Sequence, residues 1–183
     1  MTWIIVERDG VINHDADGCV TNLQAWQPYP GSLEGLALLA RNGYKVALVS
    51  NQSGIGRGVL REEDLQSIHQ KIIDEVALMG GELQGIYYCP HVPEENCDCR
   101  KPRTGMFDRI EEEFSISLQG AYCVGDSLKD IQVARAKGCK PILVRTGNGT
   151  QTETTTLLWP KYGEDIQIFE DFAAFAESLL RAG

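Results

Sequence analysis

The stretch Ile4-Ile5-Val6-Glu7-Arg8-Asp9-Gly10 passes directly from β-branched apolar residues into two carboxylates, an arginine and a glycine. A short apolar run bounded by turn residues predicts a strand that is buried on both faces. The same layout recurs at residues 45–50, where a second apolar run leads into the glycine-rich segment 51–58. An amphipathic stretch at residues 32–41 separates the two runs. Strand, helix and strand in this order predict a βαβ unit with parallel strands.

The rest of the chain continues this alternation. Further strands are predicted at residues 85–89, 121–124, 141–144 and 166–168, and further helices at residues 62–79, 106–114, 130–137 and 172–181. The fold class that follows is α/β, a Rossmann-like, doubly wound and mostly parallel sheet with helices on both faces. The polar residues 148–156 predict a surface loop. Ligands of such sheets bind at the carboxyl ends of the strands, so the residues after each strand are the first candidates for a site.

Length and element spacing predict one domain. The 183 residues fall within the size of a single hydrophobic core, so residues 1–183 are expected to form one unit. No large insertion separates the first two predicted strands, and no helical block follows the second, so a separate cap domain is not expected. Apolar residues make up 43% and charged residues 23% of the chain, which is typical of a globular protein.

The chain is acidic, with 17 basic against 26 acidic residues and a formal net charge of −9. Such a surface repels nucleic acids and anionic membranes, so neither is expected as a partner. An anionic substrate would need a local cluster of cations or a bound metal ion. No apolar run approaches the roughly 18 residues that cross a bilayer, and the first residues lead into a strand rather than a signal peptide. A cytoplasmic protein is expected.

Polar residues follow the first two predicted strands. Glu7 and Asp9, two positions apart beside Gly10, can share a divalent cation and a proton-transfer task, although a solvated strand end shows the same pattern. After the second strand, Ser50 and the amides and glycines of residues 51–58 can bring N–H groups close to a phosphate. An ordinary glycine-rich loop has the same composition.

Metal-ligand residues follow the third predicted strand. Three cysteines and one histidine fall within eleven residues, namely Cys89, His91, Cys97 and Cys99. Three thiolates and one imidazole complete a tetrahedral zinc set, and a filled set is structural. The alternatives are unliganded thiols, or a Cys97–Cys99 disulfide that the one-residue separation would strain. A metal here would hold the loop and direct the adjacent Arg100 and Lys101 over the sheet.

Two further carboxylates follow the fourth predicted strand. Asp126 comes directly after Gly125, and Asp130 stands at the start of a predicted helix. Asp126 can close a magnesium site with the carboxylates after the first strand, whereas Asp130 can cap the helix or orient nearby cations. Taken alone, the pattern is also that of a plain helix N-cap.

Together these segments resemble the motifs of the haloacid dehalogenase superfamily of phosphotransferases, which are Asp-x-Asp, a serine or threonine, a lysine, and Gly-Asp-x-x-x-Asp. The matching positions are Glu7-Arg8-Asp9, Ser50, Lys101 and residues 125–130. The loop Asn-Gln-Ser-Gly-Ile-Gly-Arg-Gly and the segment Cys-Pro-His…Cys-x-Cys-Arg-Lys-Pro are similar to the zinc-containing branch that acts on heptose bisphosphates and on histidinol phosphate. The loop is closer to that of the heptose enzymes, and the resemblance runs from residue 7 to about residue 149.

The resemblance implies a magnesium-dependent phosphatase that hydrolyses the 7-phosphate of a heptose 1,7-bisphosphate through an acyl phosphate. The implied catalytic residues are Glu7, Asp9, Ser50 and Lys101; the magnesium ligands are Glu7, Asp9 through its carbonyl, and Asp126; the structural zinc ligands are Cys89, His91, Cys97 and Cys99. The implied substrate-binding residues are Asp15, Ala16, Asp17, Gly18, Asn51, Gln52, Ser53, Arg57 and Arg100. The partner is then a small phosphorylated sugar, and the chain is expected to be a monomer.

The sequence departs from the family pattern at position 7, where Glu7 replaces the nucleophilic aspartate. The extra methylene moves the attacking oxygen by about one C–C bond, ~1.5 Å, and a misplacement of ~1 Å can cost on the order of a hundredfold in rate. Because the other motif residues are retained, we expect a phosphatase scaffold that binds magnesium and sugar phosphate with little or no turnover. The alternatives are a histidinol-phosphate phosphatase and a catalytically silent sugar-phosphate-binding protein.

Overall fold

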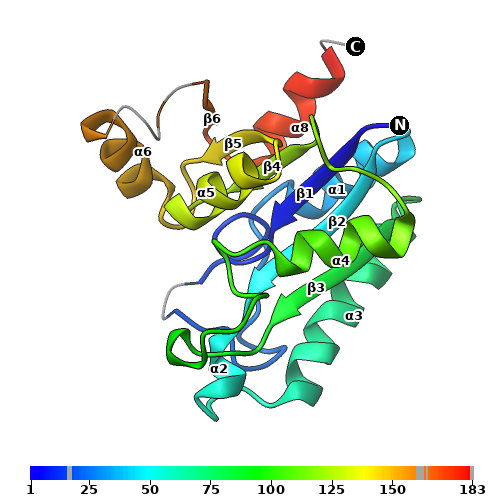
Figure 1. Ribbon diagram of the computed structural model, residues 1–183. Coiled ribbons are helices and arrows are strands. Elements are labelled where there is room, and N and C mark those ends of the chain that lie inside the picture. The colour runs from blue at the N-terminus through cyan, green and yellow to red at the C-terminus, as the bar shows by residue number, and fades with distance from the viewer. Residues whose placement is uncertain (16–17, 160–162, 164, 182–183) are drawn as a thin grey trace.

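A single six-stranded sheet forms the centre of the computed structural model, which describes residues 1–15, 18–159, 163 and 165–181 (Figure 1). The strands are β1 (Trp3–Glu7), β2 (Lys45–Asn51), β3 (Leu83–Cys89), β4 (Tyr122–Gly125), β5 (Lys140–Val144) and β6 (Gln167–Phe169). Their order in the sheet is β3-β2-β1-β4-β5-β6, and each neighbouring pair is parallel. The predicted α/β class with a doubly wound sheet is confirmed.

Helices cover both faces of this sheet. They are α1 (Ser32–Arg41), α2 (Ser53–Gly56), α3 (Glu62–Leu78), α4 (Gly105–Phe114), α5 (Leu128–Ala136), α6 (Gly149–Leu158) and α8 (Phe172–Arg181), with a 3₁₀ turn at Pro93–Glu95. Figure 1 shows α4 and α5 on one face, and α1, α3 and α8 on the other. All strands of the described ranges join this one sheet, and no separate cap domain stands beside it.

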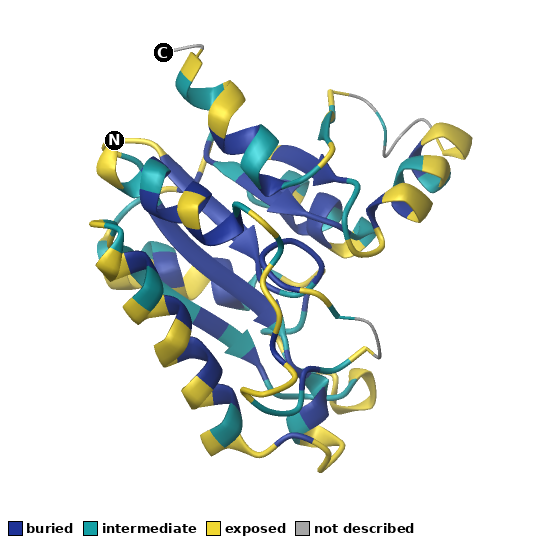
Figure 2. Cartoon of the chain, turned by 180° about the vertical axis from the view of Figure 1, so that it is seen from behind, coloured by how far each residue is buried: buried dark blue, intermediate teal, exposed yellow. Residues whose placement is uncertain are grey.

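The core consists of two apolar layers, one on each face of the sheet. Along β1, Ile4 and Val6 belong to the layer under α1, α3 and α8, whereas Ile5 points into the layer under α4 and α5. All three side chains are fully buried, as is most of the sheet in Figure 2. A strand with both faces covered has no need of polar alternation, and this explains the continuous apolar runs in the sequence.

One predicted loop is wrong. Residues 148–156 were expected to form a surface loop, but Gly149–Leu158 is the helix α6. Threonine is a weak helix former and gives no apolar period, so the sequence carries no helix signal there. Tertiary contacts override that weakness, because Thr152 and Thr156 are buried and the Thr152 hydroxyl donates to the Asp126 carbonyl at 2.8 Å.

The start of α5 also differs from the prediction. The helix begins at Leu128 rather than at Asp130, and Ser127 is its N-cap. The backbone N–H and hydroxyl of Ser127 donate to Asp130 Oδ2 at 3.1 and 2.6 Å, which closes a capping box. Asp130 therefore stands inside the first turn with its other oxygen, Oδ1, turned toward the lysine described below.

The strand order creates a switch point beside β1. From β1 the chain passes through α1 to β2 on one side, and it later returns to β4 on the other side. The carboxyl ends of these parallel strands meet at one edge, where crossover connections diverge and leave a crevice. The residues that follow β1, β2 and β4 are therefore brought together by topology.

Candidate active site and metal cluster

A pocket of about 140 Å³ lies at this switch point. The predicted residues that line it are Glu7, Asp9, Asp15, Gly18, Asn51, Gln52, Ser53, Lys101 and Asp126. Larger hollows of about 490 and 470 Å³ lie beside β3 and at the amino end of β5, and they contain none of the predicted residues. We assign the site to the small pocket, because it alone among these three contains predicted site residues, including Glu7, Asp9 and Asp126.

The Glu7 carboxylate is the centre of the pocket's hydrogen bonds. Its Oε1 accepts from the backbone N–H groups of Arg8 and Asp9 at 3.0 and 3.3 Å, and from the Ser50 hydroxyl at 2.7 Å. Its Oε2 accepts from Lys101 Nζ. Ser50 and Lys101, two of the implied catalytic residues, are therefore both bonded to Glu7 itself.

Lys101 is a buried cation between two buried carboxylates. Its side chain is 2% exposed, and its Nζ also donates to Asp130 Oδ1 at 2.6 Å. The Asn51 side chain holds the lysine backbone from both sides, since its Nδ2 donates to the Lys101 carbonyl at 3.1 Å and its Oδ1 accepts from the Lys101 N–H at 3.0 Å. Asn51, expected to recognise substrate, uses both ends of its amide to place Lys101.

The Asp9 side chain is held by donors on each of its oxygens. Gln52 Nε2 donates to Oδ2 at 2.7 Å and also to Ser50 Oγ at 2.7 Å, which links the residues after β1 and β2. Asn13 Nδ2 donates to Oδ1 at 2.9 Å. Gln52, expected to contact substrate, thus also aligns two of the predicted catalytic side chains.

Asp126 is a buried carboxylate whose charged form is disfavoured by its surroundings. Its Oδ2 accepts from the backbone N–H and the side-chain amide of Asn148 at 2.8 and 3.1 Å. Burial, and then repulsion by Asp130, nevertheless raise the pKa of Asp126 to about 6. Gly10 and Gly147 pack against it with positive φ, and a Cβ at either position would overlap the carboxylate. A divalent cation at this edge would stabilise the charged form of Asp126, so the residues present fit a magnesium ion.

Two of the predicted substrate-binding residues do not line the pocket, and two more lie outside the described residues. Arg57 is exposed at the end of α2 and does not line the pocket as described. Arg100 lines an adjacent hollow of about 280 Å³ that also contains Arg103 and Lys129. Lys129 lines both hollows, so cations border the pocket on that side. Ala16 and Asp17 lie outside the described residues.

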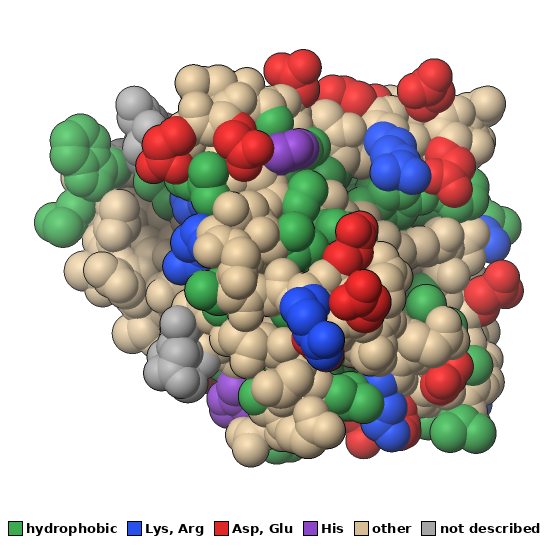
Figure 3. Space-filling model, turned by 90° about the horizontal axis from the view of Figure 1, so that it is seen from below, with side chains coloured by type: hydrophobic (Ala, Val, Ile, Leu, Met, Phe, Trp, Pro, Cys, Tyr) green, Lys and Arg blue, Asp and Glu red, His purple; other side chains and the backbone are tan. Residues whose placement is uncertain are grey.

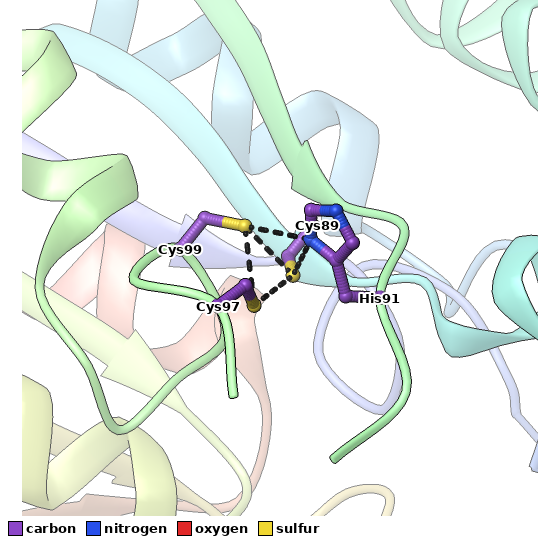
Figure 4. Close-up of side chains that lie close together, drawn as sticks. All are labelled: Cys89, His91, Cys97 and Cys99. Carbon is purple, nitrogen blue, oxygen red and sulfur yellow. Dashed lines mark hydrogen bonds between the residues drawn. The ribbon is translucent and has the colours of Figure 1, made fainter. Parts of the chain in front are cut away.

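The predicted zinc ligands converge in space (Figure 4). The ligand atoms of Cys89, His91, Cys97 and Cys99 all lie within 4.8 Å of one another. Cys89 Sγ is 3.5 Å from both His91 Nδ1 and Cys97 Sγ, and Cys99 Sγ is 3.2 Å from His91 Nδ1. A tetrahedral zinc ion with Zn–S bonds of about 2.3 Å has S···S edges of about 3.8 Å, slightly longer than the 2.9–3.5 Å between these sulfurs, so small shifts would admit the ion.

The thiols of this cluster are reduced and able to bind metal. All of them are free cysteines, which excludes the alternative of a Cys97–Cys99 disulfide in this structure. Burial works against ionisation of Cys97, but hydrogen bonds from the Arg100 backbone and the neighbouring thiols lower its pKa to about 7. The donor set fits a closed, structural zinc site, because three thiolates and an imidazole leave no open position.

Sequence reasoning missed several residues that shape the pocket. Asn148, in a segment expected to be a loop, donates to Asp126. Asp130 was expected to cap the helix or to orient nearby cations, and it does both, since it also pairs with Lys101. Arg8 and Asn13 contact Asp9 from the connection after β1. Arg8 lies within the first motif and could have been singled out, whereas Asn148 gave no signal, because only the strand order brings it to Asp126.

The surface agrees with the charge analysis. On the face seen in Figure 3, basic side chains are scattered among acidic ones and form no continuous stripe. Among the helices described, none is both long and apolar enough to cross a membrane.

Comparisons with known proteins agree with the fold. A family model described as HAD-hydrolase-like matches residues 98–174. The D-glycero-beta-D-manno-heptose-1,7-bisphosphate 7-phosphatase of Pseudomonas putida is 44% identical over 180 residues, covering 98% of this chain and 100% of that protein. The enzyme of the same name from Bordetella bronchiseptica is 42% identical over 181 residues, covering 99% of each.

Two solved structures are similar to this chain over almost its whole length. The D,D-heptose 1,7-bisphosphate phosphatase from B. bronchiseptica, solved with magnesium and phosphate, superposes with a TM-score of 0.92 at 42% identity and covers 100% of both chains. The corresponding phosphatase from Burkholderia thailandensis gives a TM-score of 0.72 at 34% identity, covering 98% of this chain and 99% of that one.

The sheet topology and the groups at its strand ends define a hydrolase of the haloacid dehalogenase type, a phosphoric monoester hydrolase. Within that class, the chain belongs to the family of the D-glycero-β-D-manno-heptose 1,7-bisphosphate 7-phosphatases.

Proposed function

We propose that this chain is a magnesium-dependent, single-domain phosphatase, spanning residues 1–183, that acts on the 7-phosphate of D-glycero-D-manno-heptose 1,7-bisphosphate. The observation that supports this most directly is the pocket at the switch point, where Glu7 is bonded to both Ser50 and Lys101. Relatives that are 44% identical over almost the whole chain carry this activity in their names.

The proposed roles combine the family resemblance with the contacts in the pocket. A Glu7 oxygen attacks phosphorus and forms an acyl phosphate, while Ser50 and Lys101 move from Glu7 to the phosphoryl oxygens. Asp9 gives a proton to the leaving sugar oxygen and later takes one from the water that hydrolyses the acyl phosphate. Glu7, Asp126 and the Asp9 carbonyl would hold Mg²⁺, which when bound neutralises charge on the phosphoryl group.

Substrate recognition is proposed for the residues that border the pocket. The sugar and its second phosphate would contact Asp15, Ala16, Asp17, Gly18, Asn51, Gln52, Ser53, Arg57 and Arg100. The zinc ion proposed at the cysteine cluster would hold the loop that carries Arg100 and Lys101, since both follow Cys99 directly. Asn51 supports this arrangement from β2 by bonding the Lys101 backbone.

Glu7 is proposed to slow turnover. Its carboxylate has to release Ser50 and Lys101 before both can bind a phosphoryl group, and its oxygen lies about one C–C bond, ~1.5 Å, further along the side chain than that of aspartate. The same bonds from Ser50 and Lys101 to Glu7 favour a second candidate function, a catalytically silent sugar-phosphate-binding protein. A third candidate, a histidinol-phosphate phosphatase, shares the predicted chemistry and differs in substrate.

The test is phosphate release with Mg²⁺ from heptose 1,7-bisphosphate and from histidinol phosphate, measured on this chain and on Glu7→Asp. We expect Glu7→Asp to raise kcat on the heptose substrate about a hundredfold. Equal turnover by the two proteins would show that Glu7 does not impair catalysis. A preference for histidinol phosphate would show that this compound, and not the heptose bisphosphate, is the substrate. If both proteins bind the heptose substrate and neither hydrolyses it, the silent binding protein is the correct function.

A further inference from the structure

Arg8 is a fully buried cation that the proposed mechanism does not use. Its side chain is 0% exposed, although it lies between two residues of the pocket, Glu7 and Asp9. A buried guanidinium is costly unless its N–H groups are paired. Arg8 Nε and Nη2 both donate to Asp9 Oδ1, at 2.8 and 2.7 Å. The third nitrogen, Nη1, turns away from Asp9 and lies 3.3 Å from Nε2 of His69 in α3.

The direction of this last hydrogen bond follows from chemistry. Arginine has donors and no acceptor, so His69 Nε2 must be the unprotonated, accepting nitrogen. His69 is 4% exposed, and burial, followed by repulsion from Arg8, lowers its pKa to about 3. The ring is therefore neutral near pH 7, with its proton on Nδ1. A protonated imidazole would face the guanidinium with like charge.

These contacts make the two oxygens of Asp9 unequal. Oδ1 accepts two N–H groups from Arg8 and a third from Asn13 Nδ2, whereas Oδ2 accepts from Gln52 Nε2 among the described contacts. A carboxylate oxygen with three donors has no lone pair left for a proton. The proton that Asp9 transfers is therefore carried by Oδ2.

We propose that His69 is a positioning residue for proton transfer: by accepting from Arg8 Nη1, it holds the guanidinium against Asp9 Oδ1 and so leaves Oδ2 to protonate the leaving group. The proposal rests on the proposed phosphatase function. In the step, the bond between phosphorus and the leaving oxygen breaks, its electron pair stays on that oxygen, and the proton moves to it from Asp9 Oδ2. Asp9 is left as the carboxylate, and Glu7 carries the phosphoryl group.

Two substrates separate this role from general stability. An alkyl phosphate such as the heptose substrate needs a proton on its leaving oxygen, whereas p-nitrophenyl phosphate releases a stable anion without one. The variants His69→Leu, which removes the acceptor, and His69→Gln, which restores one, are compared in the Glu7→Asp chain. The readout is the single-turnover rate of leaving-group release, because later hydrolysis of the acyl phosphate is common to both substrates.

We expect His69→Leu to lower this rate about tenfold or more on the heptose substrate and less than about threefold on p-nitrophenyl phosphate. His69→Gln should recover most of the loss. Tyr88→Phe is the matched control, since it keeps the ring that packs on His69 at 5.6 Å and removes a hydroxyl that bonds Glu62, and it should change neither rate. Equal losses on both substrates, or no recovery with glutamine, would overturn the proposal.

A second measurement needs no activity. In the chain as it stands, nitrogen-15 NMR of the His69 ring should show the tautomer with Nδ1 protonated and Nε2 bare, and an Nε2–H tautomer would overturn the proposal even if His69→Leu failed to fold. If Glu7→Asp hydrolyses neither substrate, the phosphatase function fails, and the tautomer still decides whether His69 accepts from Arg8.

Discussion

The cysteine cluster and the pocket at the switch point hold their proposed metal-ligand residues in opposite ways. Cys89, His91, Cys97 and Cys99 come from one segment of eleven residues. The pocket combines residues after β1, β2 and β4 with a lysine from the loop after β3, and the bond from Lys101 to Glu7 spans 94 positions. One site is formed within a single segment, whereas the other exists only when β1, β2, β3 and β4 have come together.

The two sites also differ in charge. Thiols can be buried in neutral form, so the cysteine cluster can be assembled without a metal at moderate cost. The pocket places Lys101 among buried carboxylates, and each of these groups depends on the others for its neutralisation. We therefore expect substitutions in the pocket to affect the whole fold, and substitutions in the cluster to remain local.

The largest effect on stability is expected for Lys101→Met. It leaves Glu7 and Asp130 buried without their shared cation, and removing one partner of a buried ion pair costs about 3–5 kcal/mol. Urea denaturation at pH 7 measures the loss. Lys129→Met, an exposed lysine on the same pocket, should stay within about 0.5 kcal/mol of the parent. Similar losses of stability in the two variants would show that the buried lysine contributes no more to the free energy of unfolding than the exposed one.

A smaller effect of opposite sign is expected for Asp126→Asn. The pKa of Asp126 is about 6 in the fold against 3.8 for the ordinary group, so the native state binds the extra proton between these values. The stability of the metal-free protein therefore falls as pH rises from about 4 to about 6, by up to about 3 kcal/mol. Asparagine removes that cost, so the variant should be more stable than the parent at pH 7.5 and no more stable at pH 4.

The same two proteins are also compared by their melting temperatures with and without Mg²⁺. Mg²⁺ should raise the melting temperature of the parent at pH 7.5 and have little effect on Asp126→Asn, because the cation neutralises the buried carboxylate. Asp74→Asn, on the exposed side of α3, is the control and should shift neither the pH dependence nor the response to Mg²⁺. A parent whose stability is flat from pH 4 to 7 would contradict the raised pKa.

The smallest effect on global stability is expected for Cys97→Ser. The variant should lose bound zinc, measured by elemental analysis, yet lose only about 1–2 kcal/mol, because Cys97 is a partly buried neighbour of the apolar layer under α4 and α5 and not one of its buried residues. Cys19→Ser removes a thiol of similar exposure outside the cluster and should keep its zinc. Complete unfolding of Cys97→Ser would show that the stability of the fold depends on the cluster as much as on the pocket.

The sequence was informative wherever the signal is local. The apolar runs located all six strands within about two residues, and the Cys/His spacing identified the cluster. It was uninformative where tertiary contacts decide. Helix α6 was missed because threonine gives no period, and the bonds by which the Asn51 amide holds the Lys101 backbone were not foreseen.

The sequence by itself therefore determined the strands, the four motif positions and the metal-ligand spacing, because each depends on residues close together in the chain. Only the tertiary structure decided that Ser50 and Lys101 bond Glu7, that Asp130 shares Lys101, and that His69 accepts from Arg8. These contacts join residues between 29 and 94 positions apart. They exist because β1 lies between β2 and β4, and no local pattern encodes that order.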